Sequence, residues 1–320
     1  MDDSRVIGTV VIVTYNSETS IRGCLEPLQK GMDSGWLKVV VVDNCSTDKT
    51  VQLIRIEFPL VVIHQSLYNG GFGYGNNIGI SLSEGWFCLI LNPDAVIELE
   101  DIRLLANQLK LLPDAGCIAP VVIGESGKIE MSYFPFHGFW VSILVATGLS
   151  RLIPINRIDK KWVVTGTPSD KMVEVDRVLG AVMMLKLAEI KRIGGFDERF
   201  FLYSEEEDIC LRLLSSGYRT IYLPSAKSHH QGAVSTGKEN PVTIAAVNWS
   251  RDLYMRLHCS TFVAILSRIT WVVALSLRMA VSALVGKRKR AEGYLYSIKS
   301  LIDPTYFDRV LRPKRVGEKQ

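Results

Sequence analysis

The sequence has little of what marks disulfide-rich, zinc-binding or membrane-spanning proteins. Its six cysteines include no Cys-x-x-Cys pair and no zinc-ligand spacing with neighbouring acids and histidines, so we expect scattered core thiols in a reducing compartment. The opening residues, MDDSRVIGTVVIVTYN, place no basic segment before a long apolar run, and no signal peptide is predicted. Runs of about 18 uninterrupted apolar residues, the usual mark of a spanning helix, are also missing.

Charge of one sign is scarce as well. Lysine and arginine number 37 against 33 aspartates and glutamates, a formal net charge of +4, and no nucleic-acid partner is expected from so mild an excess. The chain is 48% hydrophobic and 22% charged, a composition typical of folded domains with a core. Its 320 residues suffice for one large or two ordinary domains.

The longest apolar stretch lies near the C-terminal end. Residues 261–286 are interrupted by Arg268 and Arg278, whose spacing of ten residues is close to a whole number of helical turns. The basic clusters KRKR (287–290) and RPKR (312–315) follow. We expect an amphipathic helix or hairpin on a membrane surface. A buried helix packed on the main domain, or a spanning helix, are the alternatives.

Short apolar runs alternate with helical patterns through the first third of the chain. The runs are VVIV (10–13), VVVV (39–42), LVVI (60–63) and FCLIL (87–91), and the predicted helices are 18–32, 48–57, 75–85 and 100–112. Continuous β-branched runs are typical of strands buried on both faces. The alternation predicts an α/β fold with a mostly parallel, Rossmann-like sheet flanked by helices. Strand patterns return at 178–185 and 220–223, and the irregular segment 124–175 is expected to be a mobile excursion near an acceptor.

Polar residues follow these strands directly. In an open α/β sheet the carboxyl ends of the strands form the edge where ligands bind. One crevice is therefore expected to contain Thr14, Tyr15, Asn16, Asp43, Asn44, Asn92 and Asp94.

Two of the following loops allow both a structural and a binding interpretation. Asp43 and Asp48, in DNCSTDKT, suit helix capping, yet Asp43 also suits an acceptor for a base imide or a ribose hydroxyl. The glycines of NGGFGYGNN (69–77) allow close approach of backbone to a phosphate or sugar. Their spacing is not G-x-G-x-x-G, which argues against a nicotinamide-dependent dehydrogenase.

Acids and histidines supply candidate metal and base chemistry. Asp94, stiffened by Pro93, is a carboxylate that suits Mg²⁺ or Mn²⁺. The run SEEED (204–208) has capping-box spacing between Ser204 and Glu207, and it also suits a carboxylate held towards a cleft. In SHHQG (228–232), either neighbouring histidine is a possible metal ligand or a surface imidazole.

Taken together and in order, these stretches resemble the family 2 inverting glycosyltransferases of GT-A fold, in particular the bacterial rhamnosyltransferases. The resemblance covers about residues 6–236 and is carried by VVIVTYNS, VVVVDNCSTD, NGGFGYGNNIGI, LILNPDA, VLGAVMMLK, IGGFDERFFLYSEEEDICLRLLSSGYR and SHHQGAVS. It implies a catalytic domain over 1–240. The apolar stretch and basic clusters described above predict a helical, basic, membrane-associating region over 241–320.

The resemblance also implies residue roles. Donor binding falls on Thr14, Tyr15, Asn16, Asp43, Asn44, Asp48, Gly71, Asn77 and Asn92, the last replacing the first aspartate of a D-x-D-like motif. A divalent metal, Mg²⁺ or Mn²⁺, would be held by Asp94 and His229. The acceptor side would include Gly180, Ala181 and Glu205.

The family's FFLY-F-E-D-x-D pattern is altered in this chain. Its aspartate base position is occupied by Glu206, and Asp208 is the reserve candidate. The implied reaction is a single displacement that inverts the anomeric carbon, with rhamnose from dTDP-rhamnose as the expected sugar. Another UDP- or GDP-sugar is an alternative donor, and a weakly catalytic nucleotide-sugar-binding partner subunit is an alternative role.

The expected acceptor is a lipid-linked oligosaccharide or polysaccharide of cell-surface glycan synthesis, such as O-antigen. The expected location is cytoplasmic and peripheral, on the inner face of the plasma membrane. A homo-oligomer is possible.

Overall fold

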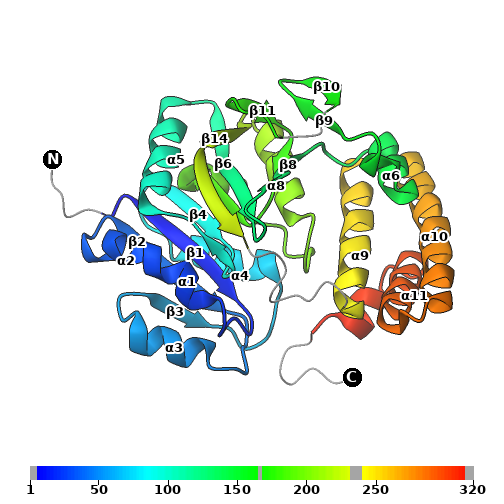
Figure 1. Ribbon diagram of the computed structural model, residues 1–320, viewed down its shortest axis with the longest axis horizontal. Helices are drawn as coiled ribbons and strands as arrows, with labels where there is room; N and C mark the ends of the chain where they lie inside the picture. The colour runs from blue at the N-terminus through cyan, green and yellow to red at the C-terminus, as the bar shows by residue number, and fades with distance from the viewer. Residues whose placement is uncertain (1–5, 165–167, 231–239, 314–320) are drawn as a thin grey trace.

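The computed structural model describes residues 6–164, 168–230 and 240–313. The main feature of these residues is a 12-stranded sheet (Figure 1). One half of the sheet is parallel. Its strands, from the edge inwards, are β3 (Val62–Gln65), β2 (Leu37–Asp43), β1 (Gly8–Thr14) and β4 (Phe87–Leu91). All four run in the same direction, so the residues that follow β1, β2 and β4 meet at one edge.

The other half of the sheet is mixed. β13 (Val182–Lys186) runs antiparallel between β4 and β6 (Ala115–Gly124), and β14 (Arg219–His230) pairs in parallel with β6. Shorter strands extend this half or form a small separate sheet: β5 (Ala95–Val96), β7 (Ile129–Glu130), β8 (Tyr133–Phe134), β9 (Ile155–Ile158), β10 (Lys161–Val164), β11 (Val173–Val175) and β12 (Arg177–Val178).

Helices cover both faces of the sheet because side chains along each central strand alternate between two apolar clusters. In β1, Val10 and Ile12 belong to one cluster and Val11 to the other. The first cluster is covered by α1 (Ile21–Leu25), the 3₁₀ turn η1 (Glu26–Leu28), α2 (Gln29–Asp33), α3 (Thr50–Glu57) and α5 (Leu99–Leu111). The second is covered by α4 (Phe72–Ser81), α7 (Leu187–Arg192) and α8 (Glu205–Ser215).

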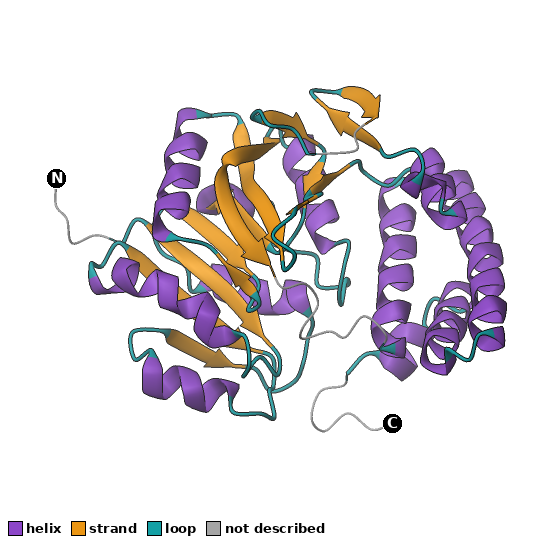
Figure 2. Ribbon diagram, in the orientation of Figure 1, coloured by secondary structure: helices purple, strands orange, loops and turns teal. Residues whose placement is uncertain are grey.

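The C-terminal part forms a helical layer beside the sheet (Figure 2). It consists of α9 (Pro241–His258), α10 (Thr261–Leu284), α11 (Arg288–Ile302) and the π-helical turn η3 (Phe307–Leu311), joined by α6 (Phe139–Thr147) and the 3₁₀ turn η2 (Leu149–Arg151). Phe200 and Phe201, which precede α8, share an apolar cluster with Trp249 and Phe307. The helical layer therefore packs directly on the segment that leads into α8.

Two opposite faces of α10 differ in their surroundings. The inner face carries the buried Ala264, Trp271 and Leu275. Both arginines of α10 contact neighbouring helices: Arg268 forms a bidentate ion pair with Asp252 of α9, and Arg278 donates hydrogen bonds to backbone carbonyls of α6. The outer face carries a continuous row of exposed apolar side chains, Phe262, Ile265, Ile269, Val273, Leu277, Val281 and Leu284. Within the described part of the chain, α10 is the one helix long and apolar enough to cross a membrane, with a mean hydropathy of 1.6 in its most apolar window.

The predicted alternation of strands and helices is confirmed, with four local differences. The strand expected at 60–63 lies at 62–65 and is an exposed edge rather than a strand buried on both faces. Pro27 falls in a 3₁₀ turn that divides the helix expected at 18–32. The strand expected at 178–185 is divided into β12 and β13 around Gly180. β6, whose run AGCIAPVVIG contains a proline, was not predicted, and the sheet is mixed rather than mostly parallel.

Candidate active site

A cavity of about 640 Å³ opens at the carboxyl edge of the parallel strands. It brings together most of the residues that the strand pattern placed in a crevice and several that the family resemblance assigned to the site. Those that line it are Thr14, Tyr15, Asn44, Gly71, Asn92, Asp94, Gly180, Ala181, Glu205 and Glu206. The strand ends of β1, β2 and β4 meet at this cavity, as the alternating pattern predicted. The turn before β13 and the start of α8, which only the family resemblance assigned to the site, also line it.

Hydrogen bonds hold the end of β2 and the residues that follow it next to the cavity. Asp43 is buried and accepts hydrogen bonds from the Thr14 hydroxyl (3.0 Å) and the Ser46 backbone N–H (3.0 Å). Asn44 donates through Nδ2 to the Gly71 carbonyl (2.8 Å), while its buried Oδ1 has no hydrogen-bond partner among the described residues. An unsatisfied amide oxygen in a polar cavity is suited to accept an N–H from a bound ligand.

Other predicted donor-binding residues lie outside the cavity and hold loops together. Asp48 accepts from the first backbone N–H groups of α3, at Thr50 (3.0 Å), and from Glu18 N–H (3.0 Å). Burial opposes ionisation of Asp48, but the hydrogen bond from the Thr50 hydroxyl and those from the two backbone N–H groups outweigh it and lower its pKa. Asn16 accepts from Thr47 N–H, and Asn77 joins α4 to the Phe196 backbone. For Asp48 the structure therefore favours the capping interpretation.

The acidic run starts α8 in an unusual backbone conformation. Tyr203 and Ser204 both have positive φ, +69° and +66°, and the Ser204 side chain makes no capping hydrogen bond. The capping box expected between Ser204 and Glu207 is wrong, because Glu207 instead contacts His137. Two successive left-handed residues are strained, and they direct the first turn of α8 at the cavity.

Glu205 and Glu206 both line the cavity with largely buried carboxylates, 5% and 9% exposed. Burial and the neighbouring Glu206 hold the pKa of Glu205 well above its usual value. One carboxylate oxygen of Glu205 is buried without a hydrogen-bond partner among the described residues. Burial also raises the pKa of Glu206, while Arg177, whose Nη1 lies 3.2 Å from Glu206 Oε1, opposes the rise. A raised pKa improves a carboxylate as a general base near neutral pH.

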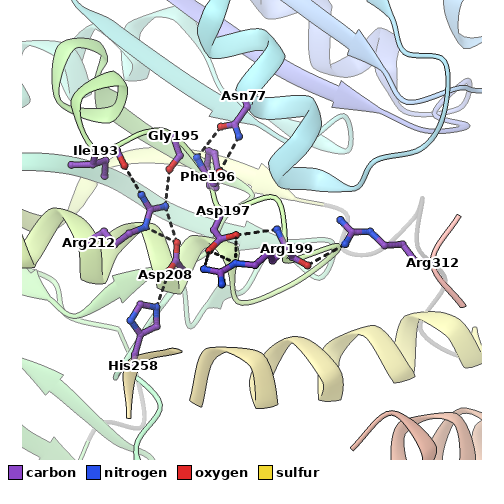
Figure 3. A network of polar contacts seen from close by, with 10 residues as sticks. All are labelled: Asn77, Ile193, Gly195, Phe196, Asp197, Arg199, Asp208, Arg212, His258 and Arg312. Carbon is purple, nitrogen blue, oxygen red and sulfur yellow. Dashed lines mark hydrogen bonds and ion pairs between the residues drawn. The ribbon is translucent and has the colours of Figure 1, made fainter. Parts of the chain in front are cut away.

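Asp208 does not line the cavity and takes part in a network of polar contacts (Figure 3). Its carboxylate accepts from Arg212 (2.7 Å) and lies 2.8 Å from His258 Nε2 on α9. Arg212 also donates to the carbonyls of Ile193 and Gly195. These contacts favour a structural role for Asp208 over its reserve assignment as the base, because the side chain joins α8 to α9 and to the preceding loop.

The histidine beside Asp94 is His230, not His229. His230 lines the cavity with Nε2 3.2 Å from Asp94 Oδ1, whereas His229 is exposed. The two residues pair with Ala95 and Val96 of β5, and successive residues of a strand face opposite sides. The choice of His229 is corrected accordingly, because the sequence pattern did not determine which neighbour would face inwards.

Asp94 and His230 fit a divalent cation as a partial site. Their facing donor atoms are separated by 3.2 Å, and adjacent ligands of an octahedral Mg²⁺ or Mn²⁺ are about 3 Å apart. Among residues 6–164, 168–230 and 240–313, no group of three or more His, Cys, Asp or Glu side chains could hold a metal. Further ligands would then come from a bound diphosphate and water, as is usual for Mg²⁺.

Several cavity residues were not predicted. Glu125, Ser126 and Glu130 come from the β6–β7 hairpin, and Phe72 and Tyr203 add aromatic surface. The turn sequence ESGK was the available signal for the hairpin, but its position over the sheet edge depends on β6. Residues 231–235, which belonged to the resembling segment SHHQGAVS, lie outside the described residues.

The mixed sheet, its flanking helices and the cavity at the carboxyl edge of the parallel strands together give the protein the GT-A glycosyltransferase fold. The mannosyltransferase PcManGT from Pyrobaculum calidifontis, solved with GDP-Man and Mn²⁺, matches 92% of this chain and 87% of its own with a TM-score of 0.54 and 16% identity. Residues 9–161 match the family model Glycosyl transferase family 2, and residues 161–233 match that for the N-terminal domain of galactosyltransferase.

Curated relatives agree with this assignment. The chain is 26% identical to N-acetylglucosaminyl-diphospho-decaprenol L-rhamnosyltransferase of Mycobacterium tuberculosis over 77% of its length and 83% of the relative's. It is also 26% identical to rhamnosyltransferase WbbL of Escherichia coli K12 over 69% of its length and 82% of the relative's. Residues 9–161 therefore match a glycosyl transferase family 2 domain, and the chain has rhamnosyltransferase homologues.

Proposed function

We propose that the protein transfers rhamnose from dTDP-rhamnose to a hydroxyl of a lipid-linked sugar diphosphate, with inversion at the anomeric carbon. The observation that carries this proposal is the convergence of Glu206, Asp94 and His230 on one cavity. The rhamnosyltransferase homologues support the sugar, and the decaprenol-linked acceptor in the name of the M. tuberculosis relative supports the acceptor class.

The proposed donor site lies at the ends of β1, β2 and β4. Asn44 Oδ1, buried and without a partner among the described residues, would accept a hydrogen bond from an N–H of the donor's nucleobase. Gly71, at φ +94°, would let the backbone approach the donor closely. Asp94 and His230 would hold Mg²⁺ or Mn²⁺, which neutralises charge on a leaving diphosphate.

The proposed base is Glu206. Its ionised carboxylate accepts the proton of the acceptor hydroxyl as that oxygen bonds to the anomeric carbon and the bond to the diphosphate breaks. Glu205, whose second oxygen is free for a new hydrogen bond, would orient a neighbouring acceptor hydroxyl. Gly180 lies beside the base: a Cβ at this position would be 3.4 Å from Glu206 Cβ, an ordinary van der Waals contact, and the absence of a side chain would leave that volume to the acceptor.

A donor panel with a base variant tests the function. Thermal stabilisation and sugar transfer would be measured with dTDP-rhamnose, UDP- and GDP-sugars, with Mn²⁺ or with chelator, and with a polyprenyl diphosphate-linked N-acetylglucosamine as acceptor. We expect selective stabilisation by dTDP-rhamnose with Mn²⁺, and transfer lost by about 10²–10⁴-fold in Glu206→Gln. Donor binding without any transfer by the wild-type protein would favour a binding subunit instead.

We also propose that α10 lies on an anionic membrane surface. The outer row of α10, from Phe262 to Leu284, is apolar and exposed, and the exposed Lys287, Arg288 and Lys289 follow it directly. An apolar stripe beside basic residues suits insertion into the headgroup region of an anionic leaflet. Contact with such a surface would bring the cavity to a lipid-linked acceptor, at the cytoplasmic face of the membrane.

A further inference from the structure

A fully buried carboxylate stands directly behind the proposed base. Glu207 is 0% exposed, accepts a hydrogen bond from the His137 backbone N–H and lies 2.7 Å from His137 Nδ1. Burial opposes ionisation of Glu207, but His137 and Arg177 outweigh it and lower its pKa to about 2. Burial also lowers the pKa of His137, and when that imidazole is neutral the backbone N–H of His137 and the Arg177 guanidinium still stabilise the carboxylate. Glu207 is therefore a fixed negative charge, and the donor-binding and base chemistry described above does not use it.

Arg177 lies between this fixed charge and Glu206. Its Nη1 is 3.2 Å from Glu206 Oε1, and its Nε is 3.7 Å from Glu207 Oε2. Nε also donates to the Pro135 carbonyl at 3.3 Å, and the guanidinium lies 4.9 Å above the ring of Phe134, its cross-strand neighbour. With contacts on several sides, and only 13% of its side chain exposed, Arg177 has little freedom to move.

Glu206 needs such a partner for two reasons. Its side chain has one more rotatable bond than aspartate, so its carboxylate can take more positions in a cavity of this size. Its ionised form is also disfavoured by burial and by the acids Glu205 and Glu207 on its own helix. Arg177 on β12 is the cation that faces it.

We propose that Arg177 is a positioning residue that holds the Glu206 carboxylate, ionised and in a single orientation, for proton removal from the acceptor, and that Glu207 and His137 fix Arg177 in turn. The inference rests on the proposed role of Glu206. In this proposal Arg177 contacts neither the donor nor the acceptor, and it acts by fixing the position of the Glu206 carboxylate. The ion pair also leaves the second oxygen of Glu206, Oε2, available for the acceptor hydroxyl.

Steady-state kinetics of Arg177→Met and Arg177→Lys test this role. We expect Arg177→Met to lower kcat by about a hundredfold, because a displacement of about 1 Å costs that much in rate. The KM for dTDP-rhamnose should change less than about twofold, and the acidic limb of the pH–rate profile should move to higher pH. Arg177→Lys, which keeps the charge without the planar fork, should recover part of kcat and return the limb towards wild type.

Arg219→Met is the matched control. Arg219 also forms ion pairs, with Asp114 (2.7 Å) and Glu174 (3.5 Å), but it does not line the cavity. Arg219→Met should leave kcat and the pH–rate profile unchanged. A purely structural role of Arg177 would instead make Arg177→Met and Arg177→Lys lose kcat equally, with no shift of the pH–rate profile. Coupling gives a second readout: in the double variant Glu206→Asp/Arg177→Met the two losses should combine to less than their product, because each breaks the same contact.

The outcomes separate the two hypotheses. An active wild-type enzyme with an Arg177→Met variant of unchanged kcat and pH profile overturns the positioning role alone. A wild-type protein that transfers no sugar from any donor of the panel overturns the proposed function, and the positioning role with it.

Discussion

Nε2 of His230 lies 3.2 Å from Oδ1 of Asp94, and both residues line the cavity where β14 pairs with β5. This contact joins two segments that are far apart in the sequence. It depends on the pairing of His230 with Ala95, which turns one of two adjacent histidines inwards. The pair is the part of the site through which a divalent cation would be bound.

His230→Ala and His229→Ala form a matched pair of variants for this contact. We expect His230→Ala to weaken Mn²⁺-dependent donor binding by about ten- to a hundredfold, because one of two protein ligands is lost. His229→Ala should stay within about twofold of wild type, since His229 is exposed. Calorimetric titration with dTDP-rhamnose, with and without Mn²⁺, measures both. Equal effects of the two substitutions would reject the assignment of His230.

Asp208→Asn tests whether Asp208 stabilises the fold rather than acting as the base. The carboxylate is buried and contacts Arg212 and His258 (Figure 3). Its neutralisation should lower the free energy of unfolding by about 2–4 kcal/mol, as expected for a buried ionic hydrogen-bond network. Urea denaturation gives this value, and kcat at a temperature where the variant is folded should fall much less than in Glu206→Gln. A kcat loss equal to that of Glu206→Gln with unchanged stability would restore Asp208 as the base.

Gly71→Ala is expected to damage both stability and the donor site. Gly71 has φ +94°, and a Cβ there would lie 2.2 Å from the Phe201 carbonyl oxygen. The backbone would have to move, at a cost of about 2 kcal/mol or more. Gly23→Ala is the control, because nothing lies within 4 Å of its Cβ position in α1, and it should stabilise by about 0.5–1 kcal/mol. Thermal unfolding compares the two, and a neutral Gly71→Ala would contradict the close packing on Phe201.

Charge placed on the outer face of α10 should weaken membrane binding. Ile269 and Leu277 are 55% and 66% exposed, so Ile269→Glu and Leu277→Glu should leave the fold intact. We expect each to reduce flotation with phosphatidylserine vesicles severalfold. Ile56→Glu is the control, since Ile56 is 71% exposed on α3. Full binding by both α10 variants would overturn the surface-lying orientation. Deletion of the C-terminal region is a poorer test, because Phe307 packs against Phe201 in the segment that leads into α8.

Acid should remove a stabilising contribution of Glu207. Its pKa falls from the ordinary value of about 4.3 in the unfolded chain to about 2 in the folded protein. A lowered carboxyl pKa stabilises the folded state fully above the unfolded value, and this stability is lost as the pH falls from about 4.3 to about 2. Glu207→Gln should therefore differ most from wild type at pH 6–7 and less at pH 3 in urea unfolding. A difference that does not change with pH would contradict an ionised Glu207.

The general architecture and much of the cavity followed from local patterns. β-branched runs predicted β1, β2 and β4, and their polar ends placed Asn44, Asn92 and Asp94 at one edge, because parallel strands end on the same side of a sheet. These features depend on short-range preferences and on the period of two residues along a strand, which a sequence displays directly.

Side-chain partners required the tertiary structure. The inward direction of His230 depends on the pairing of β14 with β5, and the ion pair of Arg177 with Glu206 joins β12 to α8 across 29 residues. Asp208, adjacent to the proposed base region in the sequence, turns to α9 because the helix places residues two apart on different faces. The sequence alone determined the kinds of side chain available and the edge of the sheet at which they gather. Strand register, helix rotation and long-range packing decided which of them face the cavity, since these depend on contacts between segments that no local pattern records.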